Sequence, residues 1–293
     1  MKYFKRIIKF FIRRFNGIWK KFKRQIIKQR ITSFKIPALS GEKNKKPQYI
    51  VTLTSYGQRI STTAPYAIFS LLNQSVLPDR IVLVVSSDVI IPPVLECLSK
   101  KGVEILFHND LGPYTKLVPA LLKFPEDILV TADDDVYYPK NWFKQLKTAY
   151  LNDSTKIHCH RAHEICFDNN KILAYRNWKH SIKTEKNNNL LFPTGVGGIL
   201  YPPYSLHESC VDISKFTALA PKADDIWFWA MAKIKGTKHS LIRNGYSKIN
   251  HVDLDEESKG LLVKNFWGGE NDNQLQAVIG HLPILMDLLL KNK

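Results

Sequence analysis

The sequence predicts an α/β fold: a mostly parallel sheet flanked by helices, preceded by an amphipathic helix at the amino terminus. Short apolar runs rich in Val and Ile alternate with segments of helical periodicity over residues 49–139. These runs end in small polar or acidic residues, and the fourth ends in three consecutive aspartates, Asp133, Asp134 and Asp135. Strands that alternate with helices favour a parallel sheet, whose strand ends share one edge. Since open α/β sheets bind ligands at the carboxyl ends of their strands, we expect a crevice there.

The first half of the body is expected to contain four strands joined by helices. Each strand is a continuous apolar run, as parallel strands covered on both faces require. The expected order is strand 49–56, helix 63–74, strand 80–88, helix 92–101, strand 103–107, helix 115–123 and the strand that ends at the aspartates.

The second half is less regular. Residues 157–166 and 171–175 suggest paired strands, and a glycine-rich loop within residues 192–201 enters another strand. Residues 223–234 read as a helix with acids in its first turn, and residues 271–291 read as a final helix. The expected organisation is an arm (residues 1–35), a linker (36–48), a body (49–285) and a tail (286–293). The body is expected to have two halves, residues 49–139 and 140–285.

The charge of the chain is concentrated at its amino terminus. The formal net charge is +17, and residues 1–35 hold 13 Lys or Arg and no acid. The remaining 30 basic residues face 26 acidic ones, so the body carries only +4. Such a nearly balanced body argues against a nucleic-acid surface spread over the fold, and no nucleic-acid partner is expected.

The basic arm has apolar residues at steps of three and four, with Lys and Arg between them. This pattern predicts an amphipathic helix lying on an anionic membrane surface. Its longest apolar run, Phe10-Phe11-Ile12, is far shorter than the roughly 20 residues that span a bilayer. A nucleic-acid-binding tail or a helix docked on a partner protein are the alternatives. The four cysteines form no CxxC pair, which favours a reducing compartment. Together with the basic arm, this leads us to expect a cytoplasmic protein that is peripheral on the inner face of the cell membrane.

The aspartate triplet is the strongest candidate for a metal site. Alternation along an extended backbone places Asp133 and Asp135 on one face and Asp134 on the other. Neighbouring carboxylates repel unless a cation lies between them, and oxygen ligands suit Mg²⁺, Mn²⁺ or Ca²⁺ better than zinc. A solvated acidic turn that closes the strand is the alternative.

Four motifs occur in a fixed order: Gly112-Pro113-Tyr114-Thr115-Lys116, Thr131 to Asp135, Gly195 to Tyr201, and Asp224-Asp225-Ile226-Trp227. This set resembles GT-A fold glycosyltransferases, which are Rossmann-like, and most of all the bacterial enzymes that build capsule, lipopolysaccharide and exopolysaccharide. The resemblance covers roughly residues 48–285. It implies a nucleotide-sugar-binding half followed by an acceptor-binding half. It further implies a nucleotide-sugar donor, UDP-sugar being favoured, a growing glycan or lipid-linked acceptor, and Mn²⁺ or Mg²⁺ as cofactor.

The resemblance also implies roles for residues. Asp135 would contact the metal, and Asp133 would share it or face the ribose. His251 would be a third ligand, although a hydrogen-bonded histidine is the alternative. Asp225, with Asp224 second, would be the base of an inverting transfer, unless the two acids only cap the helix. The implied donor contacts are Thr54, Ser55, Tyr56, Arg59, Asp88, Lys116, Asp133, Asp134, Gly197 and Gly198.

Several features leave alternatives open. Trp227 and Trp229 would form an acceptor platform or belong to the core. His158, His160, His163 and Cys166 lie within nine residues, so a zinc site is conceivable, though the spacing matches no standard finger. No GxGxxG follows the first strand and no P-loop motif occurs. A nucleotidyltransferase on a similar sheet, or a non-catalytic module that binds membrane or nucleic acid through its arm, are the competing functions.

Overall fold

The computed structural model describes residues 46–184, 188–243 and 268–291, with the isolated positions 25–26, 29, 39, 245–246 and 251–252. Almost all of the expected arm and most of the linker lie outside these residues. Within the described part of the chain, no helix has both the length and the apolar character to cross a bilayer.

A seven-stranded sheet forms the centre of the molecule, in the order β11-β5-β10-β4-β1-β2-β3. Only β10 runs antiparallel to its neighbours, so the sheet is mostly parallel, as predicted. The strand bounds are β1 Tyr49–Thr54, β2 Arg80–Ser86, β3 Val103–His108, β4 Ile128–Thr131, β5 Ile157–Cys159, β10 Ile199–Tyr201 and β11 His239–Leu241.

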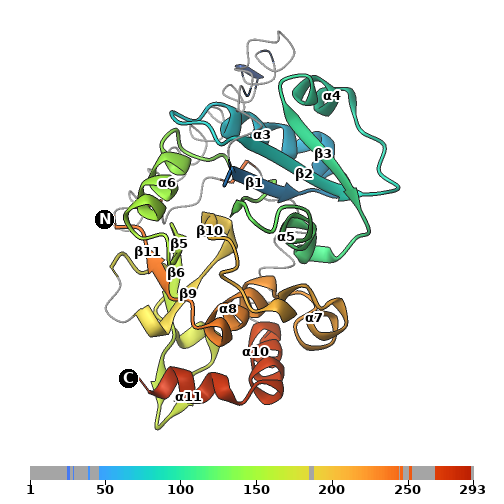
Figure 1. The fold of residues 1–293 in the computed structure, drawn as a ribbon. Helices are drawn as coiled ribbons and strands as arrows, with labels where there is room; N and C mark the ends of the chain where they lie inside the picture. Colours follow the sequence, from blue (N-terminus) through green and yellow to red (C-terminus); the bar gives the residue numbers. More distant parts are fainter. Residues whose placement is uncertain are drawn as a thin grey trace, which may run out of the picture.

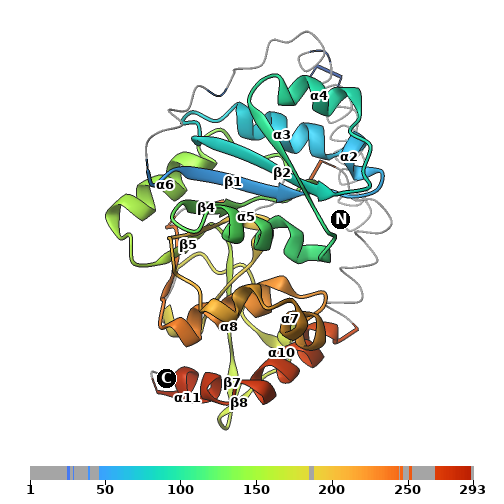
Figure 2. The same cartoon turned by 45° about the vertical axis from the view of Figure 1, so that its right-hand side comes forward.

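Helices cover both faces of the sheet, as Figures 1 and 2 show. Alternate residues of β1 point to opposite cores: Val51 and Leu53 pack with α3, α4 and α6, and Ile50 packs with α5 and α8. On the second side, α10 and α11 pack against α8. The helix bounds are α2 Arg59–Thr62, α3 Ala64–Leu72, α4 Pro93–Ser99, α5 Val118–Lys123, α6 Trp142–Asn152, α7 Ile213–Leu219, α8 Asp224–Lys235, α10 Glu270–His281 and α11 Ile284–Leu290.

The second half differs from the expectation in its strand pairing. β5 pairs with β10 and β11, while β6 (Ala162–Glu164) pairs with β9 (Leu191–Pro193). β7 (Phe167–Asp168) follows the first expected segment and pairs with β8 (Lys171–Ile172) in the second, and the Leu173 N–H donates to the Cys166 carbonyl at 2.8 Å. Three-residue strands are too short for alternation to show which strand they pair with.

The carboxyl-terminal segment forms two helices rather than one. α10 ends at His281 and α11 begins at Ile284, because Pro283 lacks the N–H that a continuous helix needs. The expected end of the body at residue 285 falls inside α11, whose Leu289 is fully buried. The packed body therefore continues to Leu290.

Candidate functional site

Ser55 and Arg59, which follow β1, contact the aspartate triplet that follows β4. The Ser55 hydroxyl donates to Oδ2 of Asp134 at 2.6 Å, and Nη1 of Arg59 donates to its Oδ1 at 2.9 Å. The two strands are adjacent and parallel, so their carboxyl ends meet. Burial raises the pKa of Asp134 to about 6, although Arg59 and Ser55 favour its ionised form.

Asp135 lies between Arg59 and His251. Nη2 of Arg59 is 3.2 Å from Oδ2 of Asp135, and Nδ1 of His251 is 3.8 Å from the same oxygen. The histidine is held by backbone pairing: a β-bridge joins Val136 to His251, and the N–H of Val252 donates to the Asp135 carbonyl at 2.7 Å. The chain from beyond β11 thus returns to the triplet.

Lys116 joins the triplet to the acid pair at the start of α8. Its Nζ lies 3.1 Å from Oδ1 of Asp133 and 3.2 Å from Oδ2 of Asp224. Burial alone would lower the pKa of Lys116, but the charges of these two aspartates and of Asp225 outweigh it and raise that pKa well above its usual value. The buried Tyr138 hydroxyl accepts from the N–H of Asp133 at 2.7 Å and fixes the backbone there.

Asp225 is held by a main-chain group rather than by a cation. The N–H of Gly195 donates to both of its carboxylate oxygens, at 3.0 and 3.1 Å. Burial, with the charge of Asp224 beside it, raises the pKa of Asp225 to about 7, while the side chain keeps partial access to solvent. Burial also raises the pKa of Asp224 against the effect of Lys116. A carboxyl group that changes protonation near neutral pH and remains accessible is suited to proton transfer.

Three of the residues expected to bind the donor lie away from these contacts. The Thr54 hydroxyl donates to the Val84 carbonyl of the adjacent strand at 2.9 Å. Tyr56 is 41% exposed and its ring lies 5.5 Å from the Arg59 guanidinium carbon. Asp88 is exposed beyond the end of β2, and no contact joins it to the acids among the described residues.

Packing inside the protein accounts for two of the loop glycines. A Cβ on Gly197 would lie 2.7 Å from Cβ of Arg161, and one on Gly198 would lie 2.4 Å from the Trp142 ring. Gly198 also has a φ of +91°. The third, Gly195, lies in the site itself, because a Cβ there would meet Asp225 at 2.9 Å and Lys116 at 3.0 Å.

Trp227, Trp229 and the histidines clustered in residues 158–163 are structural. Trp227 and Trp229 are fully buried, and their indole N–H groups donate to the carbonyls of Cys210 and Leu191. They belong to the core, so the platform alternative is wrong. The ring nitrogens of His158, His160 and His163 form hydrogen bonds with main-chain groups. Among the residues that the structure describes, no zinc ligand set forms at this cluster.

The described residues contain no group of three or more His, Cys, Asp or Glu side chains placed to hold a metal. Asp135 and His251 are nevertheless placed as two ligands of a metal site would be. Nδ1 of His251 is buried without a hydrogen-bond partner among the described residues and lies 3.8 Å from the carboxylate. Two ligands that are each about 2.1 Å from a shared ion are about 3 to 4 Å apart. Mg²⁺ commonly uses one or two protein ligands and completes its shell with water and phosphate oxygens.

Sequence reasoning missed two groups at this edge. Tyr138 follows the triplet closely, but only the fold shows that its hydroxyl returns to Asp133. Arg161 lies within the histidine-rich segment, for which the sequence suggested only a zinc site formed by the histidines and Cys166. The guanidinium of Arg161 donates to the Thr194 hydroxyl at 2.6 Å, next to Gly195. The sequence carried no clear signal for it, because residues 157–166 read as one strand segment with Arg161 inside it.

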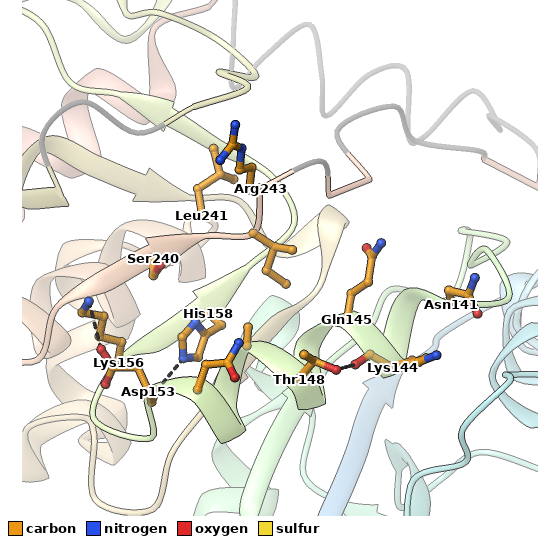
Figure 3. Close-up of a pocket in the computed structure, with 13 residues that line it drawn as sticks. Asn141, Lys144, Gln145, Thr148, Asp153, Lys156, His158, Ser240, Leu241 and Arg243 are labelled. Carbon is orange, nitrogen blue, oxygen red and sulfur yellow. Dashed lines mark hydrogen bonds and ion pairs between the residues drawn. The ribbon is translucent and has the colours of Figure 1, made fainter.

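A cavity lies elsewhere in the described part of the chain, between α6 and the edge strand β11 (Figure 3). Its volume is about 520 Å³, and Lys144, Gln145, His158 and Arg243 are among its lining residues. None of the triplet, Lys116 or the acid pair borders it. The candidate site is therefore the polar edge defined by the carboxylates, not this cavity.

No family model and no curated protein sequence matches the chain. Solved structures that match include Staphylococcus aureus TarS 1–349 in complex with UDP, at 13% identity and a TM-score of 0.44, covering 67% of this chain and 58% of that one. A mannosyltransferase from Pyrobaculum calidifontis in complex with GDP-Man and Mn²⁺ matches at 10% identity and a TM-score of 0.46, covering 74% and 61%. A 4-diphosphocytidyl-2C-methyl-D-erythritol synthase matches at 11% identity and a TM-score of 0.46, and the match covers 76% of this chain and 100% of that one. The chain thus spans about three fifths of TarS 1–349 and of the mannosyltransferase.

Proposed function

We propose that this protein is a metal-assisted glycosyltransferase that moves a sugar from a nucleotide-sugar donor to a hydroxyl group of a growing glycan. One observation carries the proposal. Asp225, an accessible carboxyl group with a pKa near neutrality, lies beside Asp224, which Lys116 joins to the aspartate triplet. A proton-accepting group and a charged, oxygen-rich donor edge are thereby neighbours, as sugar transfer requires.

On the acceptor side, Asp225 would remove the proton from the attacking hydroxyl. Its ionised form is oriented by the N–H of Gly195, and its raised pKa makes it a stronger base than an exposed aspartate. A base that serves the acceptor directly, without a covalent intermediate, favours inversion at the anomeric carbon.

On the donor side, cationic and carboxylate groups alternate along the sheet edge. Arg59 and Lys116 each bridge two carboxylates and would supply positive charge to a diphosphate. Asp135 and His251, with Asp133 as a further candidate, would hold the divalent ion. When bound, that ion would neutralise charge on the departing nucleoside diphosphate.

The acceptor and the location are proposed from the sequence of residues 1–35. A basic arm with an aromatic apolar stripe suits the anionic inner face of the cell membrane, where lipid-linked glycans are assembled. Tethering would raise the local concentration of enzyme at such an acceptor. Sedimentation with anionic vesicles should decline as salt rises, and residues 36–293 alone should stay in the supernatant.

The decisive experiment measures nucleotide released from a panel of nucleotide sugars by the purified full chain, with Mn²⁺, Mg²⁺ or EDTA. We expect one donor to be cleaved in a metal-dependent way. Asp135→Asn should abolish release, while Asp168→Asn, an exposed acid on β7, should not. A parallel assay supplies nucleoside triphosphates with sugar phosphates and reads pyrophosphate. Pyrophosphate release without cleavage of any nucleotide sugar would replace the proposal with a nucleotidyltransferase.

A further inference from the structure

Arg161 occupies the carboxyl end of β5, two residues after the strand ends at Cys159. β5 runs parallel to β4, because the intervening β10 is antiparallel to both. Arg161 therefore lies at the same edge of the sheet as the aspartate triplet, on the side of the acid pair.

The loop of residues 194–197 fixes this arginine beside Asp225. Nη1 of Arg161 donates to the Thr194 hydroxyl at 2.6 Å, and the Thr194 N–H donates to the Arg161 carbonyl at 3.1 Å. The next residue, Gly195, binds the Asp225 carboxylate through its N–H. Consecutive residues of one loop thus hold the guanidinium and the proposed base.

The charge of Arg161 is the unusual feature. Arg59 and Lys116 each contact two carboxylates, and Arg80 pairs with Glu104. Within the described part of the chain, the Thr194 hydroxyl is the one hydrogen-bond partner of the Arg161 guanidinium, which carries five N–H donors. Its side chain is partly buried, and that burial lowers its pKa, although Tyr175 and the charge of Asp225 act in the opposite direction. A partly buried cation, most of whose donors have no partner among the described residues, is suited to bind an anion.

We propose that Arg161 binds an anionic group, a carboxylate or a phosphate, carried by the acceptor sugar. This inference rests on the proposed function, because Asp225 marks the place of the acceptor hydroxyl. The guanidinium presents paired N–H groups that match two oxygens of either anion. The acceptor is then an acidic or phosphorylated sugar, and Arg161 determines that specificity.

The test is binding to the full chain of three sugars that differ in charge: methyl glucoside, methyl glucuronide and glucose 6-phosphate. Saturation-transfer NMR reads binding whether or not transfer occurs. We expect at least one anionic sugar to bind about tenfold more tightly than the neutral one. Arg161→Gln should abolish that preference, and Arg176→Gln, at an exposed arginine of the same segment, should leave it intact. Which anionic sugar prevails separates carboxylate from phosphate.

Three further arms can overturn the inference. Thr194→Val removes the internal hydrogen bond but keeps the cation; if it erases the preference as Arg161→Gln does, the arginine only supports the loop. If Arg161→Gln weakens UDP binding by the same factor, the anion belongs to the donor. If inorganic phosphate binds as tightly as glucose 6-phosphate, or all three sugars bind alike or not at all, no acceptor subsite exists. Nucleotide release by the same preparations reports the proposed function separately.

Discussion

The main-chain N–H of Gly195 donates to both carboxylate oxygens of Asp225, at 3.0 and 3.1 Å. This fork gives the side chain one orientation, and burial with the charge of Asp224 raises its pKa more than Lys116 lowers it. Asp224 differs, because it contacts Lys116 at 3.2 Å. Two neighbouring carboxyl groups of the same helix start therefore have different surroundings, which favours the second as the proton acceptor.

Asp225→Asn should lower the transfer rate by about 10²- to 10⁴-fold, the range typical of losing a general base. The amide oxygen of Asn can still accept the Gly195 N–H, so the fold should persist. Donor binding, measured by titration with the nucleotide sugar, should change little, because Asp225 lies on the acceptor side. A variant that transfers within threefold of the wild type would remove Asp225 from the mechanism.

The same substitution should stabilise the protein in a pH-dependent way. The pKa of Asp225 is about 7 in the folded protein, well above the ordinary value of an aspartate, so the folded state holds its proton where the unfolded state has lost it. Ionisation therefore costs stability as pH rises from about 4 to about 7, and the cost is constant above. Asp225→Asn should be more stable than the wild type by roughly 1–3 kcal/mol at pH 8, and equal to it near pH 3.5. Urea unfolding at both values measures this, and a larger gain at acid pH would contradict the assignment.

Lys116→Met should destabilise the protein by roughly 2–4 kcal/mol at pH 8, because it leaves Asp133 and Asp224 without their cation. The loss should shrink as pH falls, because Asp224, whose pKa is raised, then becomes neutral. Lys123→Met, at an exposed lysine in α5, should cost less than about 0.5 kcal/mol. Equal effects of the two substitutions would show that Lys116 adds nothing beyond a surface charge.

Much of the fold could be predicted because its parallel strands are buried on both faces. β1, β2 and β4 read as unbroken apolar runs, and their helices follow at regular spacing. β11 and the antiparallel β10 have three residues each, too few for a pattern to show their partners. Helix α6 lacks a side-chain cap and mixes polar with apolar residues, so its start at Trp142 had no clear signal.

The part of the candidate site that could be predicted is the set of residues that follow the carboxyl ends of neighbouring parallel strands. Topology alone brings Ser55 and Arg59 to the triplet. The link from Asp133 through Lys116 to Asp224 could not be foreseen, because it depends on the direction of a long side chain at the end of a short 3-10 helix, Gly112–Lys116. Arg161 was missed for a similar reason, since only the fold shows that no carboxylate of the described residues forms an ion pair with it and that Thr194 is its hydrogen-bond partner.

Gly198→Ala should be among the most damaging single-methyl additions. Gly198 has a φ of +91°, and the new Cβ would lie 2.4 Å from the ring of Trp142, which is fully buried and donates to the Gly197 carbonyl at 2.8 Å. Neither the backbone nor the packed ring can move freely, so we expect a loss of about 3–5 kcal/mol in the free energy of unfolding, measured in urea. Gly280→Ala in α10, where a Cβ meets nothing within 4 Å, should instead stabilise by about 0.5–1 kcal/mol. Because both variants add the same methyl group, their opposite signs would show that contact with Trp142 and the backbone conformation, rather than added volume, fix the loop that carries Gly195 to Asp225. A Gly198→Ala protein as stable as the wild type would mean that this loop is free to rearrange.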